Sequence, residues 1–166
     1  MRKHLPVLSF VGSHQSGKTT LLAKILPRLK SRGLKIGVIK HTHHHDFEID
    51  RPGKDSDVLR RAGAQSVLIA SRQKIAFVEN HGRKRWQNYL SFFRNSDAIL
   101  VEGDKHSELP KIEVFRHASG VRPLFRRLKR VIAICSDAPL KTNLTQFRLD
   151  EISKITDFVV KRIARK

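Results

Sequence analysis

A glycine-rich segment near the start of the chain has the composition of a phosphate-binding loop. Residues 12–19 read GSHQSGKT and fit the pattern G-x-x-x-x-G-K-[ST] without a mismatch. Gly12 and Gly17 allow the backbone to point several N–H groups into one concavity, which can hold an anion. Lys18 can then reach the outer phosphates of a nucleoside triphosphate, and the Thr19 hydroxyl can complete a magnesium shell. The segment therefore predicts a site for a nucleoside triphosphate with Mg²⁺.

A site of this kind also needs an acidic residue to help hold the metal, usually at the end of a neighbouring buried strand. Residues 97–103 read DAILVEG, so Glu102 follows four apolar residues. We expect Glu102 to ligate the metal directly or through water, whereas Asp97 would lie at the far end of the same strand. The alternative is a strand-end carboxylate that simply faces water.

Residues 40–56 form a histidine- and acid-rich stretch, KHTHHHDFEIDRPGKDS. Its acids are of the type that organises metal or water in a phosphate-loop protein, and Asp50, with Asp46, is the candidate for positioning a water molecule. The alternating histidines at 41, 43 and 45 could ligate a metal. However, no cysteine or second ligand cluster lies nearby in sequence, and zinc prefers a closed set of four ligands. We interpret the stretch as an active-site loop, and a solvated surface loop remains the alternative.

The elements that must position these residues alternate between apolar strands and amphipathic helices, which predicts an α/β protein. We expect a P-loop NTPase-like fold in which a mostly parallel central sheet is flanked by helices, with an added β-hairpin, in a single domain over residues 1–166. Gly33 should end the first helix, and Asp150 should cap the last. The expected strands are 5–11, 35–40, 66–71, 74–80, 97–103, 111–116 and 130–136, and the expected helices are 19–33, 55–64, 85–94 and 150–166.

The charge balance is strongly basic, with Lys+Arg 34 against Asp+Glu 15, a net charge of +19 and a pI near 11.0. Such a charge favours anionic partners: nucleotides, nucleic acid, phosphorylated metabolites or an acidic protein surface. Aromatic residues are few and no nucleic-acid-binding module is recognisable, so nucleic acid is a weaker expectation. No apolar run is long enough to span a bilayer, and one cysteine forms no internal disulfide. We therefore expect a cytoplasmic protein.

Four segments in order resemble the MobB family, the GTP-binding adaptor proteins of molybdopterin-guanine dinucleotide biosynthesis. They read GSHQSGKTTLL, GVIKHTHHHDFEIDRPGKDSDVLRRAGA, DAILVEGDKHSELPKIEVFR and AICSDAPL. The second is the most specific, because ordinary P-loop kinases and GTPases do not carry it. The resemblance implies a P-loop fold, a homodimer, binding of GTP and Mg²⁺, and at most weak GTP hydrolysis. It also implies a role in assisting the guanylyltransferase that attaches GMP to molybdopterin.

The resemblance assigns roles to particular positions. It places Glu102 as the acid of the metal site, with Thr19, and residues 41–50 and 53–56 around the nucleotide or the pterin. From its position after a buried strand we add Asp137, which could accept from guanine N1 and N2, although the N-K-x-D guanine motif is absent. Asp104 departs from the family, where an aromatic residue is usual. The phosphate loop itself would comprise Gly12, Ser13, His14, Gln15, Ser16, Gly17, Lys18, Thr19 and Thr20.

Two other interpretations stay open. Residues 116–130, RHASGVRPLFRRLKR, could form the arginine-rich lid of a small-molecule kinase that uses ATP. A basic nucleic-acid-binding protein would instead bind DNA or RNA with an affinity that falls steeply with salt and does not depend on Lys18. No arginine is placed by a motif to speed hydrolysis, although Arg51, Arg60 or a second subunit could supply one.

Overall fold

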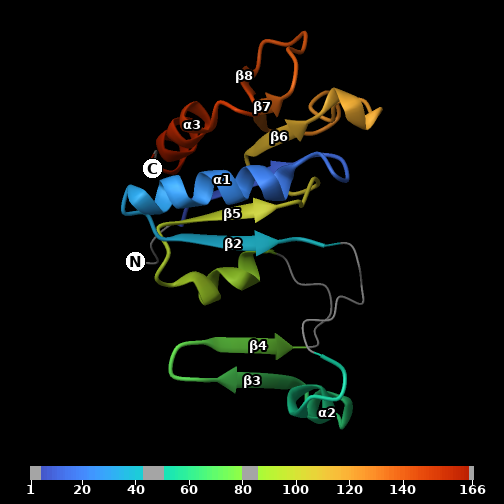
Figure 1. Ribbon diagram of the computed structural model, residues 1–166, viewed down its shortest axis with the longest axis vertical. Coiled ribbons are helices and arrows are strands. Elements are labelled where there is room, and N and C mark those ends of the chain that lie inside the picture. The colour runs from blue at the N-terminus through green and yellow to red at the C-terminus, as the bar shows by residue number, and fades with distance from the viewer. Residues whose placement is uncertain (1–4, 43–50, 80–85, 165–166) are drawn as a thin grey trace. The chain divides into compact units, whose positions relative to one another are not determined.

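The computed structural model describes residues 5–42, 51–79 and 86–164. The chain forms two compact units (Figure 1). One comprises Met1–Thr42 with Leu90–Lys166, and the other comprises His43–Tyr89. Each unit is built around its own sheet.

The larger unit holds a six-stranded parallel sheet with the strand order β2-β5-β1-β6-β7-β8. This confirms the expected α/β class and parallel sheet. The last edge strand, β8, was not predicted, because its four residues lack a clear apolar pattern. The strands are β1 (Val7–Val11), β2 (Ile36–Lys40), β5 (Ala98–Glu102), β6 (Lys111–Phe115), β7 (Val131–Ser136) and β8 (Thr145–Arg148).

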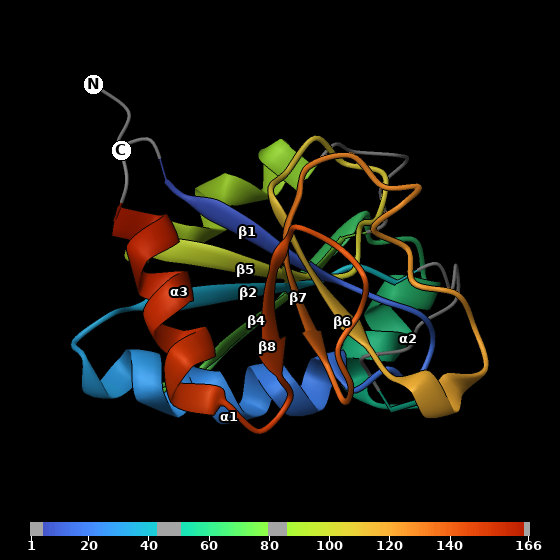
Figure 2. The ribbon, with the colours of Figure 1, turned by 90° about the horizontal axis from the view of Figure 1, so that it is seen from above.

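Two helices, α1 (Lys18–Ser31) and α3 (Ile152–Ala164), lie side by side on one face of this sheet (Figure 2). The apolar residues of α1 recur at helical spacing and pack against alternate residues of the strands to form the main core. As expected, the chain leaves α1 at Gly33, whose φ of +78° closes the helix with a bond from its N–H to the carbonyl of Lys30. An ion pair between Arg32 and Asp157 links the two helices.

On the opposite face of the sheet, Ser9, Lys111 and Glu113 are buried polar side chains that each hold a loop. Ser9 Oγ donates to the carbonyl of Gly103 at 2.6 Å. The ammonium of Lys111 donates to the carbonyls of residues 107 and 109. The carboxylate of Glu113 accepts from the backbone N–H groups of residues 124 and 125, at 2.6 and 2.7 Å. The connections after β5 and β6 are therefore held to this face by hydrogen bonds that satisfy the buried polar groups.

The prediction that Asp150 caps the last helix is wrong. The first carbonyl to accept an intrahelical bond belongs to Glu151, which receives the N–H of Ile155 at 3.0 Å. The carboxylate of Asp150 binds the guanidinium of Arg148 instead. Because α3 begins at Ile152, the capping position falls on Glu151, and Asp150 lies one residue before it.

The smaller unit contains α2 (Asp55–Arg61) and an antiparallel hairpin of β3 (Ser66–Ala70) and β4 (Ile75–Glu79), as predicted. The helix expected at 85–94 is the 3₁₀ helix η1 (Trp86–Phe93). Its last residue, Phe93, packs against β2, where a Cβ at Gly37 would lie only 2.3 Å from Cδ1 of the phenyl ring.

None of the helices in the described ranges is long and apolar enough to cross a membrane. The single cysteine, Cys135, is buried in β7, and this burial raises the pKa of its thiol to about 12. An inaccessible thiol with such a pKa is a packing residue and has no nucleophilic role.

Candidate functional site

The glycine-rich loop connects β1 to α1, so it lies at the edge of the sheet where the carboxyl ends of the parallel strands meet. Gly12 lies so close to β6 that a Cβ there would be 2.3 Å from the carbonyl oxygen of Val114 and 2.5 Å from Ser16 Oγ. Gly17 adopts φ +92°, in the left-handed region, immediately before the first residue of α1. These constraints fix a tight loop at the positive end of a long helix, which favours an anion.

Lys18 extends over this loop. Its Nζ lies 2.6 Å from the carbonyl of Ser13, and 3.3 Å from both the carbonyl of Gly12 and Oγ of Ser16. Partial burial lowers the pKa of Lys18, although the nearby Glu102 carboxylate acts in the opposite direction. The buried hydroxyl of Ser13 has no hydrogen-bond partner among the described residues. A phosphate group in the loop could accept from the unsatisfied Ser13 hydroxyl and pair with the nearby Lys18 ammonium, so the loop fits an anion.

The two predicted metal ligands lie together. Glu102 ends β5, the neighbour of β1, and Thr19 Oγ1 donates to Glu102 Oε1 at 2.6 Å. The backbone N–H of His41 donates to the carbonyl of Glu102 at 2.8 Å, so the start of the histidine-rich stretch lies beside this acid. A hydroxyl and a carboxylate next to a phosphate loop form the oxygen donor set that Mg²⁺ prefers. The residues present therefore fit a magnesium ion.

A cavity of about 280 Å³ lies between the start of α1 and the carboxyl ends of β6, β7 and β8. Asp137, the residue predicted to read the base, lines it. Oδ1 of Asp137 accepts from the backbone N–H of His117 at 3.0 Å and lies 2.9 Å from His117 Nδ1. These contacts lower the pKa of Asp137 and keep it a carboxylate. The lining residues are Gly17, Thr20, Leu21, Lys24, Arg116, Ser136, Asp137, Arg148, Leu149 and Asp150.

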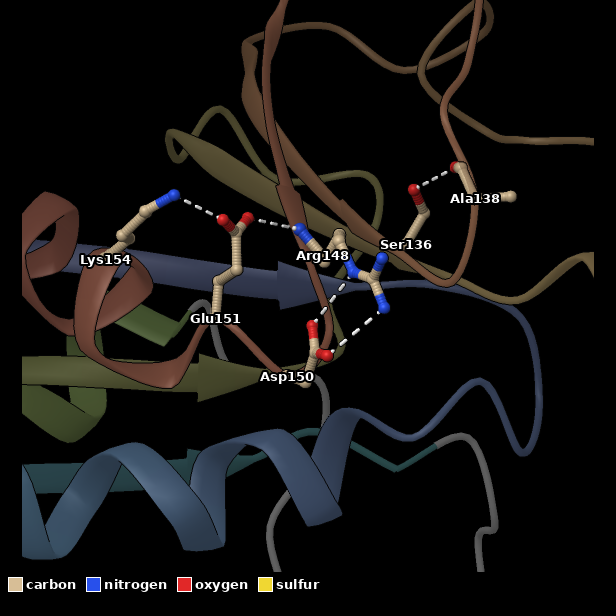
Figure 3. A network of polar contacts seen from close by, with 6 residues as sticks. All are labelled: Ser136, Ala138, Arg148, Asp150, Glu151 and Lys154. Carbon is tan, nitrogen blue, oxygen red and sulfur yellow. Dashed lines mark hydrogen bonds and ion pairs between the residues drawn. The ribbon is translucent and has the colours of Figure 1, made fainter.

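A polar network rims this cavity at the end of β8 (Figure 3). The guanidinium of Arg148 pairs with Asp150 through two bonds of 3.2 Å, and this contact lowers the pKa of Asp150. The backbone N–H of Arg148 donates to Glu151 Oε2 at 2.8 Å, and Ser136 Oγ donates to the carbonyl of Ala138 at 2.6 Å. The cavity therefore presents both carboxylates and a guanidinium, a combination suited to the donor and acceptor edges of a nucleobase and its ribose.

Arg116 is a residue of this site that sequence reasoning did not single out. It immediately follows β6, and a Cβ at Gly17 would lie 3.2 Å from its Nε. Its guanidinium therefore lies close to the phosphate loop, and Arg116 and Gly17 line the same cavity. Its position directly after a buried strand is the same signal that identified Glu102 and Asp137, but the lid interpretation of residues 116–130 concealed it.

The two predicted catalytic residues, Asp46 and Asp50, lie outside the described residues, as do the histidines at 43 and 45. The end of the histidine- and acid-rich stretch, residues 51–56, belongs to the smaller unit. There the buried carboxylate of Asp57 accepts from the N–H of Gly53 at 2.9 Å and pairs with both Arg60 and Arg61. Within the ranges that the structure covers, no three histidine, cysteine or acidic side chains are grouped closely enough to hold a metal.

The atypical Asp104 has a conformational explanation. It adopts φ +55°, in the left-handed region that aspartate enters more readily than a bulky aromatic residue. Its carbonyl accepts from Ser107 Oγ at 3.0 Å, which closes the turn after β5.

Solved structures confirm the architecture. The crystal structure of MobB from Bacillus subtilis superimposes with a TM-score of 0.77 at 26% identity, covering 98% of this chain and 100% of that one. A crystal structure described as molybdopterin-guanine biosynthesis protein B superimposes with a TM-score of 0.73 at 27% identity, covering 93% of this chain and 98% of the other.

Sequence comparison leads to the same group. The chain is 41% identical over 163 residues to the molybdopterin-guanine dinucleotide biosynthesis adapter protein of Escherichia coli, covering 94% of this chain and 92% of that protein. It is 35% identical over 162 residues to the adapter protein of that name from Haemophilus influenzae, covering 96% and 90%. Residues 7–137, which include the phosphate loop, Glu102 and Asp137, match the family model of molybdopterin guanine dinucleotide synthesis protein B, and the chain therefore belongs to the MobB family.

Proposed function

We propose that the protein is a GTP-binding adapter that assists the attachment of GMP to molybdopterin. Family membership and the names of its relatives support the adapter role. The observation that carries the nucleotide part of the proposal is the contact between Thr19 and Glu102 at the end of a phosphate loop that contains an unsatisfied buried hydroxyl.

In this proposal the loop N–H groups and the N-terminus of α1 hold the β-phosphate, and Lys18 exchanges its loop carbonyls for phosphate oxygens. Thr19 and Glu102 would hold Mg²⁺, which when bound neutralises charge on the β- and γ-phosphates. Arg116, which lies close to Gly17, is placed to contact phosphate oxygens as well. Hydrolysis is at most weak, with Asp50 and Asp46 as candidates for positioning water.

Asp137 would select guanine. Both contacts with His117 end on Oδ1, so Oδ2 carries neither of them and can accept from the N1 and N2 donors of guanine. Adenine offers no such pair of donors on that edge, and a carboxylate opposite it would remain unpaired. The proposal extends to molybdopterin or its guanine dinucleotide, the guanylyltransferase as protein partner, and a homodimer.

The test is calorimetric titration with GTP and ATP in the presence and absence of Mg²⁺. Lys18→Ala should weaken GTP binding at least a hundredfold, because it removes the cation that faces the phosphates. Lys30→Ala is the matched control, since it removes the same charge from the exposed last turn of the same helix. Glu102→Gln should leave magnesium-free binding nearly unchanged and abolish most of the gain from Mg²⁺.

The outcomes separate the alternatives. GTP preference that depends on Lys18 supports the adapter proposal. A preference for ATP, with phosphorylation of a small acceptor, would favour a kinase. Equal losses in Lys18→Ala and Lys30→Ala would show that general charge, and not the phosphate loop, binds the nucleotide.

A further inference from the structure

A second cavity, of about 440 Å³, lies in the larger unit between the loop at residues 122–127 and the connection from β7 to β8. It shares no lining residue with the cavity beside the phosphate loop. Its volume is in the range of pockets that hold small molecules. The lining residues are Arg122, Pro123, Phe125, Arg126, Arg127, Leu140 and Lys141, and we call it the basic pocket.

Charge in the basic pocket is of one sign. Three arginines and one lysine line it, and the described lining includes no acidic side chain. Arg126 stacks over the ring of Phe125, with Cζ 5.6 Å from the ring centroid. None of the four cationic side chains has an ion pair or hydrogen bond to another described residue. The cavity therefore carries four exposed cationic residues without a counter-charge in the described lining, and an anion bound there would relieve their mutual repulsion.

Both walls of the basic pocket are held by hydrogen bonds from side chains of the sheet, the buried Glu113 of β6 and the partly buried Gln146 of β8. On one side the Glu113 carboxylate accepts from the N–H groups of Leu124 and Phe125. On the other side Gln146 binds the backbone of Leu140 twice, as an acceptor at 2.8 Å and as a donor at 2.9 Å. A solvated basic loop needs no such supports. The supports fix the pocket in advance, which reduces the entropy cost of binding.

We propose that the basic pocket binds a phosphorylated planar heterocycle. The guanidinium groups offer paired donors that match phosphate oxygens, and Phe125, Pro123 and Leu140 form an apolar surface on which a flat ring can stack. A cavity of this volume suits a small molecule better than a protein segment, which would need a longer groove.

The position of the basic pocket extends the proposed function. The connection between β7 and β8 lines both cavities, with Asp137 in the first and Leu140 and Lys141 in the second. One molecule could therefore hold a nucleotide and a second phosphorylated ligand on neighbouring parts of the same segment. Only this link between the two cavities rests on the proposed function; the pocket itself does not.

Flavin mononucleotide is the probe, because it combines a planar ring, a phosphate monoester and intrinsic fluorescence, and riboflavin is its uncharged counterpart. Binding should raise the fluorescence anisotropy of flavin mononucleotide saturably. Riboflavin should bind at least tenfold more weakly, since the phosphate contacts are charge-assisted. The double variant Arg126→Gln/Arg127→Gln should lose at least tenfold in affinity for flavin mononucleotide.

Arg162→Gln is the matched control, because Arg162 stacks over Phe158 at 5.2 Å on α3, far from the basic pocket in sequence but with the same arginine–phenylalanine arrangement. It should leave binding unchanged. The unfolding midpoint of each variant checks that the chain still folds. Equal binding of flavin mononucleotide by the double variant and by the control would overturn the proposal.

Two further binding measurements test where flavin mononucleotide binds and whether the pocket prefers a small molecule or an acidic peptide. Lys18→Ala should bind flavin mononucleotide as the native chain does, and a loss there would place the probe in the phosphate loop and overturn the proposal. Hexaglutamate should not compete with the probe. If it binds with Arg126/Arg127 dependence while flavin mononucleotide does not bind, the pocket serves an acidic protein segment instead. GTP titrations of the same variants distinguish failure here from failure of the proposed function.

Discussion

At the scale of single residues, the best predictions concern side chains whose position follows from a motif and a strand end. Thr19 follows the lysine of the phosphate loop, and Glu102 ends an apolar strand; parallel pairing of β1 with β5 then brings them to 2.6 Å. Arg116 was missed because it was assigned to the arginine-rich segment of residues 116–130, where no motif distinguishes it from the other arginines. Its role depends on the pairing of β6 with β1, which residue types alone do not specify.

Asp137 gives a sharp prediction at this scale. In Asp137→Asn the amide oxygen can keep the contacts with His117, but the NH₂ group then takes the place of Oδ2 and faces the guanine donors, so GTP binding should weaken about tenfold to a hundredfold. Xanthosine triphosphate has a carbonyl in place of the 2-amino group, and the amide NH₂ can donate to it, so its affinity should rise. The measurement is the ratio of the two dissociation constants by calorimetry.

Inosine triphosphate, which lacks the 2-amino group, is the control ligand: native chain and variant should differ less for it than for GTP. His117→Ala should reduce discrimination without abolishing it, because the backbone N–H of residue 117 still binds Oδ1. Unchanged ratios in Asp137→Asn would show that another residue reads the base.

At the scale of elements, the sequence predicts most helices and strands but not what covers the second face of the sheet. β6 reads KIEVF, and its alternation correctly places Ile112 in the core with α1 and α3. The same alternation would place Lys111 and Glu113 in water. Both are buried, because the connections that follow β5 and β6 fold over them and supply backbone partners. Loop backbone contacts of this kind leave no periodic signal in a sequence.

Glu113→Gln tests this loop support. Glutamine can accept from only one of the two backbone N–H groups with its oxygen and turns an NH₂ group toward the other, so one buried donor is left unsatisfied. The expected loss is about 1–3 kcal/mol in the free energy of unfolding. Urea unfolding measures it, with Glu108→Gln, an exposed acid on the preceding connection, as the control that should change stability little.

The contribution of Glu113 to the pH dependence of native stability has a definite sign. Burial raises the pKa of Glu113 above its unfolded value, so the folded chain binds this proton more tightly. Native stability should therefore fall as pH rises from the unfolded pKa of about 4.3 to the folded pKa, and Glu113 adds no slope above that. Glu113→Gln lacks this slope, so the difference between the two proteins should be larger near pH 4.5 than at pH 7.5. A constant difference would mean that the hydrogen bonds from Leu124 and Phe125 offset the effect of burial, so that the pKa of Glu113 is not raised in the folded chain.

At the scale of the whole molecule, composition predicted an anionic partner but not where it binds. The net charge of +19 is spread along the sequence. In the described ranges, the phosphate loop, its adjoining cavity and the basic pocket all lie in the larger unit. The strand order that gathers them cannot be derived from composition or periodicity. The same holds for the division into two units, because periodicity finds elements and does not report which of them pack together.

The excess of positive charge also predicts how stability responds to salt. Several described ion pairs are exposed, such as Arg148–Asp150 with side chains 71% and 70% accessible, so they stabilise little and are easily screened. Repulsion among 34 basic residues facing 15 acids should dominate instead. Raising KCl from about 20 to 200 mM shortens the screening length about threefold, and the unfolding midpoint should rise by a few degrees, corresponding to about 1–2 kcal/mol. Calorimetry at fixed pH measures it.

Specific anion binding must be separated from screening in that experiment. Potassium phosphate at matched ionic strength should raise the midpoint further than KCl, since phosphate can bind where a cavity offers preformed donors. Lys18→Ala should keep the full KCl effect and lose part of the extra phosphate effect. A midpoint that falls with KCl would mean that attractive ion pairs outweigh repulsion, and the basic surface would then be balanced by contacts that composition does not reveal.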